Sequence, residues 1–392
     1  MRNPLSKRIM EIQPSGIRKF FDIASEMKDV ISLGVGEPDF DTPWRIREEG
    51  IYSLEKGRTF YTSNAGLLEL RNEISKYMAR TIEVTYQAEK EVVLTAGGSE
   101  GIDIALRCMV EAGDEVLVPQ PSFVSYVPCV AMTGATPVVI PLQNENQFKL
   151  TLAELEAVTT AKTKVLMLSF PNNPTGAVMT REDLLPIAEF VLQHDLYVIS
   201  DEIYSELCYH GPHVSIASLP GMRERTVVIN GFSKGFAMTG WRLGYCCGPE
   251  MIIEQMIKLH QFAIMCAPTT SQYAAVEGLR NCSSDVEKMR KSYNERRRFL
   301  MHAFQHMQIG CFEPFGAFYV FPDIREFGMT SEEFATQLLM AEKVAVVPGT
   351  AFGDCGEGFL RISYAYSLED IKEALRRLEK FIMKLRGCES GC

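Results

Sequence analysis

Between about residues 91 and 247 the chain alternates short apolar runs rich in β-branched residues with segments whose apolar residues recur at helical spacing. The runs predict strands at 91–96, 114–118, 136–140, 163–170, 196–200, 226–229 and 243–247. Amphipathic segments at 100–111 and 181–194 stand between them and predict helices. Because parallel strands need helical crossovers, this alternation predicts an α/β fold around a mainly parallel sheet.

The pattern changes after about residue 283. A long charged helix is predicted at 286–307, followed by the block 316–319, shorter strands and a last helix that opens at Ser367. Ser367 with Asp370 matches a helix-start cap. A chain of 392 residues is also longer than a single hydrophobic core usually accommodates. We therefore expect a large domain and a smaller α+β domain.

Charge and hydropathy restrict the partners of the chain. Its net charge of −10 argues against nucleic acid, which is bound by concentrated Lys and Arg. No apolar run approaches the length of a membrane span or resembles a signal peptide, so we expect a cytoplasmic protein without a membrane partner. The eleven cysteines are expected to be reduced; Cys388 and Cys392 in the tail are too few ligands for a metal site, and none is predicted.

Several unusual residues follow the predicted strands, where α/β sheets bind ligands. The segment 97–100 contains Gly98, Ser99 and Glu100 and opens a helix after the strand 91–96, an arrangement that suits an anion. A tight structural turn is the alternative. Phe123 follows the next strand on a proline-stiffened loop, where its ring could lie flat on a planar ligand or belong to the core.

Two further strand ends carry polar side chains. Asn173 lies in the turn-forming segment 171–176 and could donate to a phenolate oxygen, unless the segment is only a structural turn. Asp201 ends a strand with Tyr204 three residues later, so a carboxylate could pair with a protonated ring nitrogen and a phenol could bond the same ring. Asp201 could instead cap a helix.

Lys234 stands in the segment 230–244 among small and aromatic residues. An amine in such surroundings is partly desolvated, which lowers its pKa and favours the neutral nucleophile needed to form an imine. Most lysines are solvated, but this lysine has no charged neighbourhood that would explain it. Arg242, eight residues later, would be free to bind phosphate.

Together these segments resemble the fold-type I aminotransferases of class I/II, which use pyridoxal 5′-phosphate. The likeness extends over nearly the whole chain through the blocks 32–40, 61, 66–71, 97–100, 119–123, 170–176, 198–204, 230–244 and 358–364. It implies a large domain, residues 46–283, with a mainly parallel seven-stranded sheet flanked by helices. It also implies a small domain formed by residues 284–392 with the N-terminal segment 1–45.

The resemblance implies a role for each candidate residue. Lys234 would carry the cofactor as a Schiff base and move the substrate proton, and Asp201 would hold the pyridine nitrogen. The remaining cofactor contacts would come from Phe123 against the ring, Asn173 and Tyr204 at the 3′ oxygen, and Gly98, Ser99, Ser233, Arg242 and the Glu100 backbone around the phosphate. Arg361, with Gly36 and Asn173, would hold the substrate α-carboxylate.

Tyr61 in such enzymes reaches the phosphate of the neighbouring subunit and is expected to take part in catalysis, so a homodimer is implied. The chain departs from many relatives in two places. Gly231 stands where they place a Ser that contacts phosphate or Lys, and Phe123 stands where they carry Tyr or Trp. Both departures concern single cofactor contacts, and Ser233 in particular could contact nothing.

The substrates implied are an amino acid and a 2-oxo acid such as 2-oxoglutarate, in a ping-pong reaction. The residues of segment 14–20 and of the motifs are most similar to those of one branch of this family. It is the aspartate-aminotransferase-like prokaryotic branch with aromatic and broad specificity. Some aspartate-specific relatives carry Lys at the position of Ser99, so its absence favours aromatic donors. An acidic donor such as aspartate stays an alternative.

Two other functions share this fold. Carbon–sulfur β-lyases use the same lysine and also begin with Cα proton loss, so the motifs cannot fully separate them. Sensor domains of certain transcription regulators would need a DNA-binding extension, for which this acidic chain leaves little room. The physiological donor, the pathway, oligomers beyond the dimer and any role of the cysteine tail do not follow from the sequence.

Overall fold

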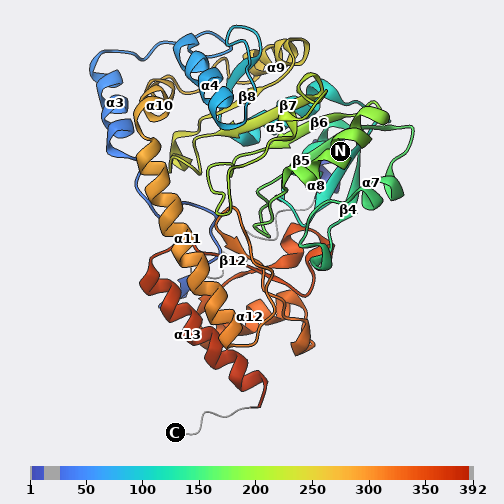
Figure 1. Cartoon of the computed structure of the whole chain (residues 1–392), viewed down its shortest axis with the longest axis vertical. Coiled ribbons are helices and arrows are strands. Elements are labelled where there is room, and N and C mark those ends of the chain that lie inside the picture. The colour runs from blue at the N-terminus through green and yellow to red at the C-terminus, as the bar shows by residue number, and fades with distance from the viewer. Residues whose placement is uncertain (1, 13–26, 388–392) are drawn as a thin grey trace.

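The computed structural model of the chain describes residues 2–12 and 27–387, and its upper part is built on one large twisted sheet (Figure 1). The seven strands are β2 (Val92–Thr95), β3 (Glu115–Gln120), β4 (Thr136–Pro141), β5 (Thr163–Ser169), β6 (Tyr197–Asp201), β7 (Thr226–Gly231) and β8 (Gly244–Cys247). Each lies within two residues of its predicted bounds. Their spatial order is β2-β8-β7-β6-β5-β3-β4. Only β8 runs antiparallel to its neighbours, which confirms a mainly parallel sheet.

Alternate residues of the strands face two different helical layers. In β5, Val165 and Met167 belong to a core cluster with Ile102 of α5, whereas Leu166 and Leu168 belong to a cluster with Ile187 of α8. This period of two is what a sheet buried on both faces requires. The helices of this part are α3 (Trp44–Glu55), α4 (Leu68–Thr81), α5 (Gly98–Met109), α6 (Tyr126–Thr133), α7 (Leu152–Val158), α8 (Arg181–Gln193), α9 (Glu250–Ala263) and α10 (Thr269–Asn281).

A smaller α+β part lies below the large sheet in Figure 1, and α11 (Ser283–His306) runs from one part to the other. It contains an antiparallel sheet in the order β11-β12-β9 and two further helices. The elements are β9 (Tyr319–Val320), α12 (Ser331–Glu342), β10 (Val344–Ala345), β11 (Val347–Pro348), β12 (Leu360–Ser363) and α13 (Leu368–Leu385). The short helix α1 (Lys7–Glu11) packs near α6 of the large part.

The N-terminal segment joins this smaller part, as the sequence predicts. Strand β1 (Ile31–Ser32) pairs in parallel with β10, and the backbone N–H of Ser363 donates to Leu33 across 2.8 Å. The last helix also begins as predicted, because the hydroxyl of Ser367 accepts from the backbone N–H of Asp370 at 3.1 Å. The domain boundaries at residues 45 and 283 stay predictions.

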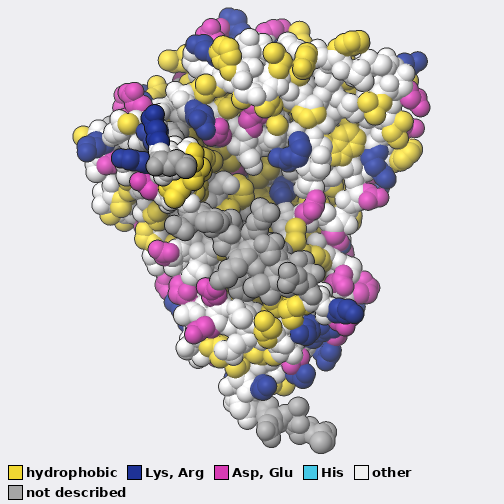
Figure 2. Space-filling model, turned by 180° about the vertical axis from the view of Figure 1, so that it is seen from behind, with side chains coloured by type: hydrophobic (Ala, Val, Ile, Leu, Met, Phe, Trp, Pro, Cys, Tyr) yellow, Lys and Arg dark blue, Asp and Glu magenta, His cyan; other side chains and the backbone are white. Residues whose placement is uncertain are grey.

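The remaining expectations concern the cysteines, membrane spans and surface charge, and some of them fall on residues that the structure does not describe. Segment 14–20 and Cys388 with Cys392 are outside them. Within the described ranges, all nine cysteines have free thiols and no helix is long and apolar enough to cross a membrane. Figure 2 shows basic and acidic side chains interspersed over the visible face instead of gathered into a single positive area.

Candidate active site

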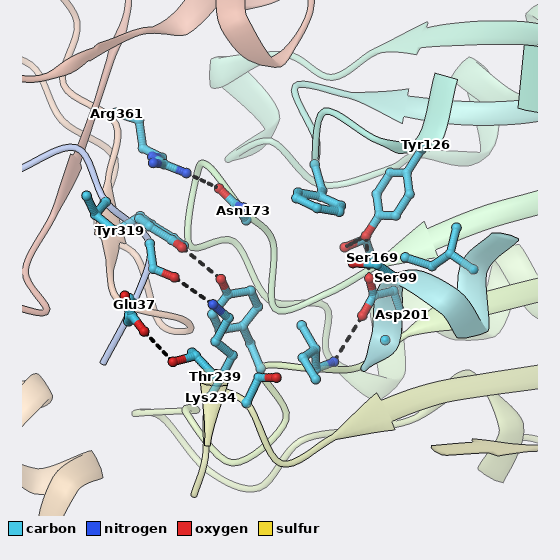
Figure 3. A pocket seen from close by; sticks show the side chains of 18 of the residues that line it. Glu37, Ser99, Tyr126, Ser169, Asn173, Asp201, Lys234, Thr239, Tyr319 and Arg361 are labelled. Carbon is cyan, nitrogen blue, oxygen red and sulfur yellow. Dashed lines mark hydrogen bonds between the residues drawn. The ribbon is translucent and has the colours of Figure 1, made fainter. Parts of the chain in front are cut away.

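A cavity of about 420 Å³ lies where the carboxyl ends of the large sheet's strands meet the smaller part (Figure 3). Asp201 ends β6, and Lys234 follows β7 by three residues, so neighbouring strands deliver them to the same edge. Eleven of the residues predicted from the sequence line this cavity: Gly36, Gly98, Ser99, Phe123, Asn173, Asp201, Tyr204, Ser233, Lys234, Arg242 and Arg361. The side chains of Glu100 and Tyr61 do not.

The amine of Lys234 lies between two aromatic rings and donates to the carbonyl oxygen of Gly36 across 2.6 Å. The pKa of Lys234 is lowered from 10.5 to about 8, mainly by burial and then by the nearby Arg361 and Arg242, while Glu37 and Asp201 oppose the shift. At pH 7 about a tenth of an amine with this pKa is neutral, far more than for a solvated lysine. A neutral amine is the form that attacks a carbonyl and accepts a proton.

Asp201 is buried at the end of β6, where Tyr126 and Ser169 were not anticipated from the sequence. The Tyr126 hydroxyl lies 2.7 Å from Oδ2 of Asp201 and 2.8 Å from the Ser169 hydroxyl, and the backbone N–H of Ile203 donates to Oδ1 at 3.1 Å. Burial raises the pKa of Asp201, and the Tyr126 hydrogen bond opposes that rise. A cationic partner placed in the cavity would restore the charged carboxylate.

The first turn of α5 forms a cradle for an anion. Gly97 has φ +81°, and a Cβ there would lie 2.6 Å from a guanidinium nitrogen of Arg242. That guanidinium donates to the carbonyl oxygens of Thr239 at 3.0 Å and Ala96 at 3.3 Å, which holds it over the turn. Helix N–H groups, a neighbouring guanidinium and the hydroxyls of Ser99 and Ser233 are the donor set that a phosphate takes.

Glu100 supports this turn from behind. Its carboxylate accepts from the backbone N–H of Ala96 at 2.5 Å and bonds Nδ1 of the buried His260 on α9 at 2.7 Å. The side chain therefore fixes the entry to α5 and faces away from the cavity. That the Glu100 backbone contacts a phosphate stays a prediction.

Arg361 closes the opposite end of the cavity from Asp201 (Figure 3). Its guanidinium lies between the rings of Tyr319 and Phe352, at 4.6 and 4.7 Å from their centroids, and donates to Oδ1 of Asn173 at 3.0 Å and to the carbonyl of Gly34. Its Nε is buried without a partner within the described ranges. A planar guanidinium held this way is suited to a carboxylate.

Aromatic rings line the cavity near Asp201 and Lys234. Phe123 packs edge-to-face with Tyr126, with ring centroids 5.7 Å apart. Tyr204 is buried, and its hydroxyl lies 2.7 Å from that of Tyr319 on β9. That Phe123 stacks on a bound ring stays a prediction, and so do the other individual cofactor contacts.

The close packing around Gly231 explains why this chain has glycine where related sequences have serine. A Cβ at this position would lie 2.9 Å from the Cα of Gly244 and 3.0 Å from the carbonyl oxygen of Leu243. A serine therefore cannot enter here unless β7 and β8 move apart. The hydroxyl that related enzymes place at this point has no room in this chain.

Sequence reasoning missed five polar residues that line the cavity: Glu37, Tyr126, Ser169, Thr239 and Tyr319. Tyr126 follows Phe123 by three residues, and Tyr319 belongs to the block 316–319, where the sequence pattern changes. The sequence therefore carries a weak signal for each of them. Ser169 and Thr239 carry no distinguishing local pattern. Glu37 bonds the Thr239 hydroxyl across the mouth of the cavity.

Tyr61 lies on the surface, with 80% of its area exposed, beside a separate hollow lined by residues 59–61 and 266–270. It does not reach the cavity of its own chain. The expectation for Tyr61 concerns the cavity of a partner subunit.

A buried acid, a desolvated lysine, a phosphate cradle and a carboxylate-binding arginine together fit pyridoxal 5′-phosphate and an amino acid. The fold and this site define a pyridoxal-phosphate-dependent transaminase of fold type I.

The comparisons with known proteins agree. Residues 28–378 match the family described as aminotransferase class I and II, and the chain belongs to this family. It is 47% identical to an aspartate aminotransferase of Pyrococcus abyssi over 96% of this chain and 98% of the relative. It is 44% identical to aromatic-amino-acid aminotransferase 2 of Thermococcus litoralis over the same shares. A solved aromatic aminotransferase of Pyrococcus horikoshii superposes with a TM-score of 0.90 at 44% identity, covering 95% of this chain and all of that one.

Proposed function

We propose that this aminotransferase moves the α-amino group of an aromatic amino acid, or of a broad range of amino acids, to a 2-oxo acid such as 2-oxoglutarate. The observation that carries the proposal is the buried Arg361, whose guanidinium is fixed between two rings and whose Nε has no partner among the residues that the structure describes. Every α-amino acid and every 2-oxo acid presents the planar carboxylate that this group binds.

The preference for the side chain of the donor amino acid follows from which groups the positive charges of the cavity would bind. Among the described residues that line it, the cations are Lys234, Arg242 and Arg361. Each has an assigned partner: the cofactor, its phosphate and the α-carboxylate. Ser99 provides no further charge for a second carboxylate, whereas Tyr319 provides aromatic surface beside Arg361. This lining favours an uncharged aromatic donor.

Aspartate is the second candidate, because a relative of 47% identity is named an aspartate aminotransferase. Initial rates with tyrosine, phenylalanine, aspartate and alanine, measured in parallel with 2-oxoglutarate, separate the two. We expect the highest kcat/KM with tyrosine or phenylalanine. A strong preference for aspartate would contradict the aromatic assignment. The lyase alternative is not favoured, since the relatives described above are named aminotransferases, and it would require pyruvate and ammonia from cystathionine without an acceptor.

In the mechanism, bound pyridoxal 5′-phosphate supplies an electron sink that makes the Cα–H bond of an attached amino acid acidic. Asp201 holds a negative charge where the ring nitrogen would bind and so favours its protonated form. Arg361 and Asn173 fix the α-carboxylate and thereby orient the Cα–H bond. Lys234, as a neutral amine, accepts the Cα proton at Nζ and donates it again, so one residue acts as base and acid.

We propose that the active unit is a homodimer in the cytoplasm. Phe60, which lines the hollow beside Tyr61, is 81% exposed, and Phe262, four residues before Cys266 of the same hollow, is 82% exposed. Exposed aromatic residues in one area are typical of a subunit interface. Such an interface would place Tyr61 at the phosphate cradle of the partner.

A further inference from the structure

Tyr204 and Tyr319 are two buried phenols that line the cavity. Their oxygens are 2.7 Å apart, and either one could be the donor on distance alone. Neither hydroxyl has another hydrogen-bond partner among the described residues. The two side chains come from different parts of the fold, since Tyr204 follows β6 and Tyr319 begins β9.

The surroundings of Tyr319 decide which phenol donates. A phenol has one proton, so only one of the two O–H groups can occupy the bond between them. The guanidinium of Arg361 lies over the Tyr319 ring, with its central carbon 4.6 Å from the centroid, and a guanidinium offers donors but no acceptor. The Tyr204 oxygen is therefore the acceptor available to Tyr319. A nearby cation also makes the Tyr319 hydroxyl the more acidic of the two and hence the better donor.

Packing leaves the Tyr319 hydroxyl little freedom to turn elsewhere. The ring meets Tyr204 edge-to-face, with centroids 5.8 Å apart, and lies against Phe318 at 4.9 Å. The oxygen points at Gly36, where an added Cβ would overlap it. Gly36 thus has a structural reason to be glycine, and its carbonyl is the group that accepts from Lys234 at 2.6 Å.

We propose that Tyr319 is a positioning residue: it donates to the Tyr204 oxygen and so directs the Tyr204 proton toward the phenolic oxygen of the cofactor. The inference rests on the proposed function, in which Tyr204 contacts that oxygen. Tyr319 also connects the two ends of the site, because the ring that fixes Tyr204 is the ring on which Arg361 lies. Its role is specific to the hydroxyl and separable from the packing of the ring.

The experiment is a double-mutant cycle on Tyr204→Phe and Tyr319→Phe, in which both substitutions keep the ring and remove the oxygen. Holoenzymes are titrated from low to high pH, and the midpoint of the change in cofactor absorbance is recorded. A hydrogen bond to the phenolate stabilises the form that has lost its proton, so its weakening moves the midpoint upward. We expect a rise of about half a pH unit in Tyr319→Phe and about one unit in Tyr204→Phe.

If Tyr319 acts through Tyr204, adding Tyr319→Phe to the Tyr204→Phe protein moves the midpoint no further. Equal shifts from Tyr319→Phe in both backgrounds, or no shift in either, would overturn the inference. Tyr364→Phe is the matched control: its buried hydroxyl donates to the carbonyl of Ala317 at 3.1 Å, away from the cavity, and its midpoint should equal that of the wild type.

A second readout uses the apoproteins. Urea unfolding of the two single variants and the double variant should also be non-additive, because each substitution breaks the same hydrogen bond. Additive losses would contradict the pairing. Failure of the proposed function gives a different result: a wild-type protein that shows no titrating cofactor band removes the site and this inference together, whereas a normal wild-type titration with additive variants removes the inference alone.

Discussion

The Tyr126 hydroxyl donates to Oδ2 of Asp201 across 2.7 Å and so joins the first turn of α6 to the end of β6. The carboxylate is also bonded by the backbone N–H of Ile203 at 3.1 Å. These two donors stabilise the charged form of a group whose burial otherwise raises its pKa. Tyr126 therefore prepares Asp201 for a positively charged ring nitrogen.

Tyr126→Phe is expected to weaken cofactor binding. The loss of one hydrogen bond to a charged group is worth about 1.5–3 kcal/mol, hence about a tenfold or greater rise in the Kd of pyridoxal phosphate. Fluorescence quenching of the apoprotein by added cofactor measures it. Tyr86→Phe is the control, because the Tyr86 hydroxyl is buried without a partner in the described structure and should leave the Kd unchanged. An unchanged Kd in Tyr126→Phe would show that Asp201 does not depend on it.

Arg361→Lys keeps a positive charge but loses the planar pair of donors. We expect kcat/KM to fall about 100-fold for amino acids and 2-oxo acids alike, because both carry the same carboxylate. Steady-state kinetics with tyrosine and 2-oxoglutarate measure the change. Arg297→Lys is the control: this buried arginine pairs with Glu313 at 2.7 Å, outside the cavity, so it should change stability and leave kcat/KM near the wild-type value. A normal kcat/KM in Arg361→Lys would refute the carboxylate assignment.

The lowered pKa of Lys234 predicts how the stability of the apoprotein depends on pH. Since it is lowered from 10.5 to about 8, the folded apoprotein binds fewer protons than the unfolded chain between these values. Stability therefore rises with pH over that window, and the cost of the buried charge is fully present below pH 8. Lys234→Met should stabilise the apoprotein at pH 7 and remove this component of the pH dependence. Urea unfolding at pH 7 and pH 10 tests it, and equal effects at both values would be evidence against a lowered pKa.

Tyr61 and Lys234 are expected to act in the same site from different subunits. Tyr61→Ala and Lys234→Ala homodimers should each have little activity. After unfolding and refolding as an equal mixture, half of the dimers carry one intact site, so about a quarter of wild-type activity should return. Refolding each variant alone is the control. No recovery in a mixture shown to contain hybrid dimers would place Tyr61 outside the partner's site.

Much of this site could be predicted because the chemistry lies at strand ends, and strand ends are visible in the sequence. Asp201 and Asn173 follow apolar runs directly, and Lys234 is conspicuous in its uncharged surroundings. Tyr319 could not be placed in the same way. It reaches Tyr204 only because the smaller part, which carries β9, meets the carboxyl ends of the large sheet's strands, and a contact across 115 residues leaves no local pattern.

Glu100 shows a second limit of sequence patterns. The sequence places Glu100 in the first turn of α5, but the direction of its side chain depends on His260, far along the chain on α9. The pairing of β1 with β10 belongs to the same class, because it joins residues 31–32 to residues 344–345. Local periodicity predicts elements, whereas these contacts depend on how the elements pack.

The most direct measurement is a half-reaction in which the holoenzyme is mixed with tyrosine and no 2-oxo acid, and its absorbance is followed. We expect the yellow cofactor band to be replaced by that of pyridoxamine phosphate, with one equivalent of the aromatic 2-oxo acid formed per site. Addition of 2-oxoglutarate should restore the yellow form, and Lys234→Ala should carry out neither step. A persistent yellow band with every amino acid tested, or substantial turnover by Lys234→Ala, would contradict the assignment of Lys234 as cofactor anchor and proton carrier.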